Sequence, residues 1–311
     1  MIKIMKKWVP GIMLFAVFMV FVFIPSLRAI GQQGQLEPLL EDEQISQRLH
    51  EMQAEIEAMG YSFTVGPNSA VQYDLSQLCT FNPHLLLDRL YMIQLEDFTA
   101  ATTLPSSYIG FFTSVKNQGA AGIGWAIVCN GEFESVIKKQ DGVDVDLSEQ
   151  YLVSCNPYGW GCNGGSWMYD LFVDPGAVSE SCFPFTGCDT PCNHNCPYPY
   201  VAQGWAFVNP GVAVPSVNEI KQAIYTYGAV GAAVYVDQYF QLYTAGVFDR
   251  CKKKVRYPNH MIQLVGWDDN KGQTGAWLLK NSWGTAWGEN GFMWIAYNCN
   301  LVGYEANYVI Y

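Results

Sequence analysis

The chain has 311 residues, a length that suits about two domains of ordinary size. Half of the residues are hydrophobic and 14% are charged, which excludes a disordered chain and is typical of a globular protein with a large core. The net charge of −11 disfavours nucleic acid and anionic membranes as partners, although an acidic balance also simply keeps a protein in solution.

The N-terminus has the pattern of an export signal. Three lysines within the first seven residues precede an apolar run of 14 residues, Gly11 to Ile24, which is short for a membrane span and right for a signal peptide. We expect residues 1–29 to be removed, although the cleavage pattern at residues 25–29 is imperfect. Membrane contact is expected only if this leader stays uncleaved. In either case the folded part is exported, to a secreted, periplasmic or extracellular location.

The next segment, residues 30–103, contains one predicted helix over residues 43–60. Its apolar residues recur at alternating spacings of four and three, which places them on one helix face. They are Ile45, Leu49, Met52, Ile56 and Met59. Gly60 is a plausible C-terminal stop.

The remainder divides into a helical and a strand-rich part, expected at residues 104–208 and 209–311. Helices are predicted over residues 124–139 and from residue 147, with Ser148 as a cap. Residues 209–214 are rich in Gly, Pro and small residues and mark the crossing. Strands are predicted at residues 231–236, 261–267, 276–279 and 292–296.

Three separated motifs carry the chemistry. Residues 117–127 read N-Q-G-A-A-G-I-G-W-A-I, with Gly124 at the start of a predicted helix. His260 lies 136 residues later (260 minus 124), in N-H-M-I-Q-L-V-G-W. Asn281 follows in K-N-S-W-G, with W-G-E at residues 287–289.

These motifs, in this order, resemble the papain-like cysteine proteases, whose first signature reads N-Q-G-S-C-G-S-C-W-A-F. The resemblance covers about residues 104–311. It implies an α+β, two-domain fold, with a helical left domain, an antiparallel β-barrel-like right domain and a cleft between them. The attacking cysteine of the family corresponds to Gly124 here, and a half-cystine of the family corresponds to Ala121.

The resemblance also implies the roles of the other residues. In an active member, a thiolate at a helix N-terminus attacks a peptide carbonyl, a histidine protonates the leaving amine, and an asparagine orients the histidine. Here these last two correspond to His260 and Asn281, and Gln118 corresponds to the side chain that holds the oxyanion. Substrate-binding positions implied by the family are Gly122, Gly164, Gly165, Met168, Ala233 and Trp283.

Simpler interpretations stay open for each residue. His260 and Asn281 can form a satisfied polar pair, Gln118 can cap local backbone, and Trp283 can be core. Gly164 and Gly165 can make a turn. In the family, residues like 30–103 form a propiece whose helix docks on the enzyme and whose following strand fills the cleft. The predicted helix at 43–60 can also be a plain amphipathic helix.

The ten cysteines fit an oxidising compartment. By family position Cys251 and Cys299 are expected to pair. Cys155 is expected to pair within the cluster Cys182, Cys188, Cys192 and Cys196. Cys162 has lost its family partner at position 121, so it is free or re-paired. Without the leader and propiece nine cysteines remain, which predicts at least one free thiol, best placed at Cys129. The cluster superficially suggests zinc around His194, but disulfides are favoured and no metal is expected.

The leading hypothesis is an exported, catalytically inactive relative of the papain-like peptidases that retains peptide binding in its cleft. Binding an extended peptide by backbone hydrogen bonds needs no nucleophile. One alternative is an active endopeptidase that uses an unforeseen nucleophile or a water activated by His260. Another is a structural or interaction protein that uses an outer surface and keeps its own propiece in the cleft. No cofactor is implied.

Overall fold

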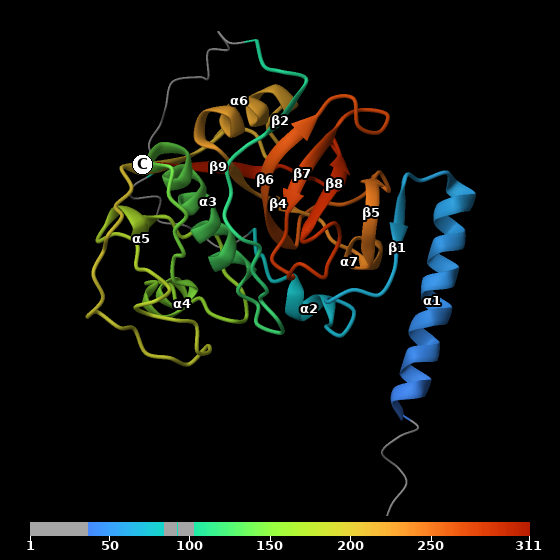
Figure 1. Ribbon diagram of the computed structural model, residues 1–311, viewed down its shortest axis with the longest axis horizontal. Coiled ribbons are helices and arrows are strands. Elements are labelled where there is room, and N and C mark those ends of the chain that lie inside the picture. The colour runs from blue at the N-terminus through green and yellow to red at the C-terminus, as the bar shows by residue number, and fades with distance from the viewer. Residues whose placement is uncertain (1–36, 84–91, 93–102) are drawn as a thin grey trace, which may run out of the picture. The chain divides into compact units, whose positions relative to one another are not determined.

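The computed structural model describes residues 37–83, 92 and 103–311 (Figure 1). The expected leader, residues 1–29, lies outside the described residues. The chain divides into two compact units, Met1–Gln44 and Ile45–Tyr311. Of the first, only the beginning of helix α1 (Glu37–Met59) is described. In the described ranges, no helix combines the length and apolar character that a bilayer crossing requires.

The second unit is built on one mixed sheet of nine strands. Its order is β1-β5-β8-β7-β6-β4-β9-β3, with β2 paired to β6. All pairs are antiparallel except β5 with β8, which is parallel. The sheet is therefore mainly antiparallel, as the resemblance implies, with one parallel pair. The strands are β1 (Phe63–Val65), β2 (Ser107–Ile109), β3 (Gly204–Phe207), β4 (Val230–Val234), β5 (Tyr243–Phe248), β6 (His260–Asp268), β7 (Ala276–Lys280), β8 (Phe292–Ala296) and β9 (Tyr304–Ile310).

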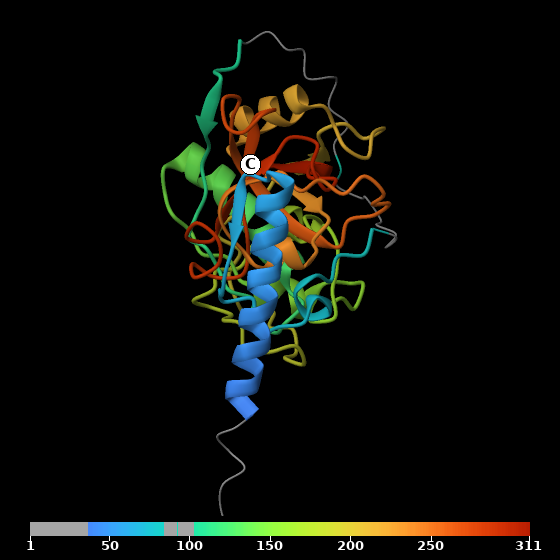
Figure 2. The ribbon, with the colours of Figure 1, turned by 90° about the vertical axis from the view of Figure 1, so that its right-hand side faces the viewer.

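Helices pack on this sheet and beside it. In Figure 1, α3 lies between the strands on one side and α4 and α5 on the other. Helix α6 lies at one end of the sheet, at the top of both Figure 1 and Figure 2. The other helices are α2 (Leu75–Leu78), α3 (Gly124–Asp141), α4 (Glu149–Cys155), α5 (Asp170–Val173), α6 (Val217–Tyr227) and α7 (Gln238–Gln241). Together they form the papain-like α+β fold that the motifs imply.

Helix α3 is the central helix of the fold. Its residues from Gly124 to Ile137 are all buried, so it is covered on every side, as a helix in the middle of a core must be. Gly142 ends it in the left-handed conformation at φ 72°, and its N–H bonds the carbonyl of Lys138. The first residue of α3 therefore stands at a fixed place between the helical layer and the sheet.

The predicted elements are present with shifted ends. The helix expected over 43–60 begins earlier, at Glu37, and the one expected over 124–139 runs to Asp141. The hydroxyl of Ser148 accepts the Tyr151 N–H at 2.9 Å and caps α4 as expected. The strand predicted at 292–296 is found there, and that at 231–236 is shifted to 230–234. Helix α6 was not predicted, although Ser216 and Glu219 form a capping box at its start.

The strand of the propiece, β1, lies outside the cleft, and the propiece reaches the cleft only farther along the chain. Strand β1 instead extends the sheet at its edge by pairing with β5. The Asn68 amide then bonds the carbonyls of Gln241 and Tyr243 at 2.9 and 3.2 Å, and the Ser69 hydroxyl bonds the Trp283 carbonyl at 2.6 Å. These contacts bring the chain to short helix α2, and the last residue of α2 and the residues after it enter the site described next.

Candidate functional site

The three sequence motifs meet at the N-terminus of α3. The Nε2 atom of His260 donates a hydrogen bond of 2.8 Å to the amide oxygen of Asn281. A Cβ atom built on Gly124 would lie 3.5 Å from Cε1 of that imidazole and 3.5 Å from the Ser282 hydroxyl. Position 124 thus faces the His260 ring, and glycine offers no atom there that can attack a carbonyl.

Gln118 lies on the other side of position 124. Its Oε1 accepts the Ser282 hydroxyl at 2.7 Å, and its Nε2 donates to the Ala121 carbonyl at 3.0 Å. The same Nε2 reaches the carbonyl of Leu78 at 3.2 Å. The amide therefore both ties local backbone and holds a carbonyl oxygen brought in from another segment, as an oxyanion donor must.

His260 is buried beneath the segment that contains Leu78. It is 1% exposed, and the indole of Trp283 lies 4.9 Å from it between ring centroids. Burial lowers the pKa of His260 to about 4, although bonds to the Asn281 side chain and the Leu78 backbone favour the protonated ring. The imidazole is therefore neutral at pH 7 while the propiece covers it.

This burial predicts an acid-sensitive stability. The unfolded chain binds a proton at His260 near its usual pKa of 6.5 and the folded chain only near 4, so stability falls as pH drops through that window. We expect wild type to lose up to about 3 kcal/mol of unfolding free energy relative to His260→Gln between pH 7 and pH 4. Denaturant unfolding of both proteins at the two pH values measures it. A wild-type-to-variant difference that is independent of pH contradicts the buried neutral ring.

Residues Leu78–Phe81 cross the site, and we call them the occluding segment. Besides the Leu78 carbonyl on Gln118, the Thr80 hydroxyl donates to the Gly122 carbonyl at 3.0 Å. The Phe81 N–H donates to the carbonyl of Asn259, next to His260, at 3.0 Å. The propiece therefore occupies the cleft as the family implies, through this irregular segment.

Besides Leu78, which is 1% exposed, Phe81 is a buried anchor of the occluding segment. It is 7% exposed, and its ring lies 5.8 Å from that of Trp167. The predicted lining residues Met168 and Ala233 belong to the same apolar cluster and are fully buried beside it. Trp167, which was not among the expected binding residues, makes the ring contact with Phe81.

The site glycines differ in what they permit. Gly164 has φ 114°, and a Cβ on it would lie 2.2 Å from the Thr80 carbonyl oxygen, so it serves both a turn and the approach of another backbone. A Cβ on Gly122 would meet the Thr80 methyl at 2.7 Å. Gly165 instead packs against the Trp125 ring: a Cβ added to Gly165 would lie 2.6 Å from the nearest atom of that ring. Gly122 and Gly164 border the occluding segment, and Gly165 serves the core.

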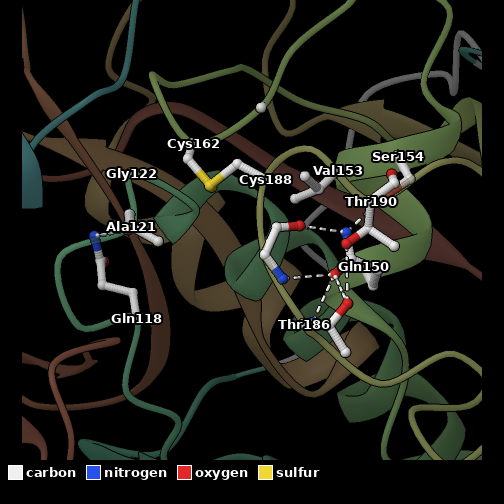
Figure 3. Close-up of a disulfide and its surroundings, with 12 residues drawn as sticks. Gln118, Ala121, Gly122, Gln150, Val153, Ser154, Cys162, Thr186, Cys188 and Thr190 are labelled. Carbon is white, nitrogen blue, oxygen red and sulfur yellow. Dashed lines mark hydrogen bonds between the residues drawn. A yellow bond between two sulfur atoms is a disulfide. The ribbon is translucent and has the colours of Figure 1, made fainter.

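Cys162, which has no partner at Ala121, is bonded to Cys188 (Figure 3). Gln150 of α4 holds the loop that brings Cys188 to it, since its Oε1 accepts the Thr186 N–H at 2.7 Å. The bridge lines a hollow of about 630 Å³ beside the occluding segment. Cys162 is therefore bonded to Cys188, where the family pattern would bond it to a cysteine at position 121.

The other cysteines follow the expectations. Cys251 pairs with Cys299, and Cys155 pairs with a member of the expected cluster, Cys192. The remaining bridge is Cys182–Cys196. Cys188, Cys192 and Cys196 are thus all in disulfides and offer no thiolate to a metal. Cys129 is free and buried, and so is unable to replace the missing nucleophile; Cys79 of the propiece is the second free thiol.

A family model described as "Papain family cysteine protease" matches residues 106–311. The match covers more than half of the chain and contains helix α3, strands β2 to β9 and the three site motifs. The chain therefore belongs to the papain family of cysteine proteases.

Its relatives include cathepsins. Cathepsin L of Sarcophaga peregrina is 36% identical over 199 residues, which are 61% of this chain and 57% of that protein. Pro-cathepsin H of Mus musculus is 34% identical over 202 residues, 62% of this chain and 59% of that protein. The chain thus matches less than two thirds of the length of these relatives. The digestive procathepsin L2 proteinase from Tenebrio molitor larval midgut superposes with a TM-score of 0.74 at 28% identity, covering 90% of this chain and 96% of that one.

Several residues at the site escaped the sequence analysis. Ser282 fixes Gln118, Asn259 accepts the Phe81 N–H, and Leu78 supplies the carbonyl between Gln118 and His260. Asn259 and Ser282 lie inside the motifs, directly beside His260 and Asn281, and that adjacency was an available signal. Nothing in the local sequence around Leu78 marks it as a residue that reaches the site.

Proposed function

We propose that this papain-family chain is a catalytically inactive peptidase homologue whose cleft binds an extended peptide. The observation that carries the proposal is the glycine at position 124, placed where a side chain would face His260 at 3.5 Å. Peptide hydrolysis in this family requires a thiolate at that place, and other triad groups without their nucleophile leave only about 10³–10⁴-fold over water.

Peptide binding is supported by the contacts of the occluding segment. The carbonyl of Leu78, the last residue of helix α2, is held by Gln118, and a second backbone group, the Phe81 N–H, is held by the carbonyl of Asn259. Gly122 and Gly164 leave room for the same chain because neither has a Cβ. A peptide from another protein can use these groups once the propiece has left, since none of them depends on a nucleophile.

The test uses protein freed of its propiece through an engineered cleavage site before Leu104. We expect no labelling of position 124 by a thiol-directed epoxide or iodoacetamide, and no hydrolysis of mixed peptide substrates that depends on His260. Comparison of wild type with His260→Ala isolates any activity of the histidine. Hydrolysis by wild type that disappears in His260→Ala would establish an active peptidase and overturn the proposal.

A second candidate function is an interaction protein that keeps its propiece. Its support is the anchoring of residues 62–81, which includes the β1–β5 pairing and the Asn68 and Ser69 bonds. A chain without the thiolate also has no means of cutting its own propiece. The mass of the exported protein separates the two functions: loss of residues 30–103 favours an open cleft, and their retention favours an outer surface.

A further inference from the structure

Positive charge is concentrated in one loop between β5 and β6, residues 250–257, which we call the basic loop. It holds five of the 17 Lys and Arg residues of the chain and no acidic residue, in the sequence R-C-K-K-K-V-R-Y. Outside it the chain carries a net charge of −16, from −11 minus +5. A charge run is a solvated surface by default, so its contacts must decide whether it is a site.

The basic loop is fixed in place. Cys251 is bonded to Cys299, and the N–H of Lys252 donates to the side-chain oxygen of Asn300 at 2.8 Å. The amide nitrogen of Asn300 in turn donates to the Tyr235 carbonyl at 3.1 Å. A ligand of this loop therefore has little backbone to order when it binds.

Most of the charge in the basic loop is unneutralised. Arg250 and Lys252 share the carboxylate of Asp237, at 2.8 and 3.2 Å. Among the described residues, no carboxylate forms an ion pair with the other three cations. These three are Lys253, Lys254 and Arg256, and all are exposed.

The loop also lines an open surface hollow of about 620 Å³. Of the described residues that line it, none is acidic. Two tyrosines join the cations in its wall: the Arg256 guanidinium lies 5.2 Å from the ring of Tyr257, and the Lys252 ammonium lies 5.7 Å from that of Tyr235. Tyr257 is 38% exposed, so part of its ring is open to a ligand.

We propose that the basic loop is a binding site for a sulfated polysaccharide. Its cations pair with sulfate groups as they do with phosphate, and the aromatic faces are suited to cover a sugar ring. Short runs rich in Lys and Arg are a known form of heparin-binding patch. The proposal is independent of the state of the cleft.

Charge distribution favours this ligand over other polyanions. A duplex nucleic acid or an anionic bilayer presents a broad negative surface, which the −16 of the rest of the chain would repel. A single polysaccharide strand is narrow enough to follow one loop. Four disulfides also fit an oxidising, extracytosolic compartment, where such polymers rather than nucleic acids are the usual partners.

The experiment measures binding of heparin to the full exported protein by calorimetry at several salt concentrations. We expect salt-sensitive binding by wild type, weakened about tenfold or more in Lys253→Ser/Lys254→Ser/Arg256→Ser. The matched control removes three other lysines and the same net charge: Lys138→Gln/Lys139→Gln/Lys271→Gln. It is expected to bind heparin within about twofold of wild type, because overall charge alone does not make the site.

Three other probes distinguish the ligand class: desulfated heparin, poly-glutamate, and vesicles with phosphatidylserine. We expect each of them to bind wild type more weakly than heparin does. Thermal unfolding of both triple variants verifies that the fold is kept. The proposal is overturned if wild type does not bind heparin, if the control variant loses as much affinity as the loop variant, or if poly-glutamate or the vesicles bind as tightly as heparin.

Discussion

Gly124→Cys, with its propiece removed, is expected to hydrolyse peptide substrates at least about 10³-fold faster than wild type in a thiol-dependent manner. The new Cβ would face His260 at 3.5 Å, at the first residue of a buried helix, where the helix dipole and an imidazolium lower a thiol pKa. Asn281 already orients the ring and Gln118 already offers its amide. Kinetics on mixed peptide substrates, with and without a thiol alkylating agent, provide the measurement.

The matched control is Gly124→Ala. Any Cβ at this position would lie 2.9 Å from Oε1 of Gln118, so that side chain must shift in both variants, and only the cysteine adds sulfur. Gly124→Cys/His260→Ala should also be inactive. A folded, propiece-free Gly124→Cys protein without activity would contradict the prediction and would mean that the cleft has diverged beyond its nucleophile.

The Cys162–Cys188 bridge changes how such a rescue is designed. Restoring the family half-cystine with Ala121→Cys would introduce a competitor for Cys162, which is already bonded to Cys188 in a loop held by Gln150. The single change at position 124 therefore tests the missing nucleophile without disturbing the wall of the cleft.

The motifs predicted the fold class and the place of the site, because the residues that form the centre of the site are the motif residues themselves. The spacing around Gly124 gave the central helix, and the buried runs gave β6, β7 and β8 within a few residues. The pairing of His260 with Asn281 also matched the implied geometry. The helix and the strands follow from periodicity that the sequence displays directly, whereas the fold class and the His260–Asn281 pair are what the resemblance to the papain-like proteases implies.

The features that were not predicted depend on contacts between segments that lie far apart in the sequence. The sequence showed that Cys162 lacked its partner, but the choice of Cys188 depends on how Gln150 folds the 186–190 loop. Strand β1 is only three residues long, so its pairing with β5 leaves almost no periodicity to detect. The route by which Leu78 reaches Gln118 is likewise set by tertiary packing.

The strength of that packing can be tested at the anchor of the occluding segment. Phe81 contributes a buried ring against Trp167, whereas Ser76 of helix α2 is exposed. Truncating a buried Phe to Ala costs about 3–5 kcal/mol in protein cores. The occluding segment is held at the site by the buried side chains of Phe81 and Leu78 and by a few hydrogen bonds, so much of that loss should appear as local opening, not as global unfolding.

In full-length protein, Phe81→Ala is therefore expected to raise the rate of limited proteolysis within residues 74–83 by about 10²-fold or more, because cleavage follows the population of the open form. Ser76→Ala is the control and should stay within about threefold of wild type, since an exposed side chain adds little to docking. Mapping the cut sites by mass spectrometry provides the measurement, and thermal unfolding verifies that the rest of the chain is folded. Equal cleavage rates in the two variants would show that the hydrogen bonds hold the occluding segment without the aromatic anchor. An extended ligand would then need no large apolar side chain to bind, because the cleft would select its ligands mainly through backbone contacts at Gln118, Gly122 and Asn259.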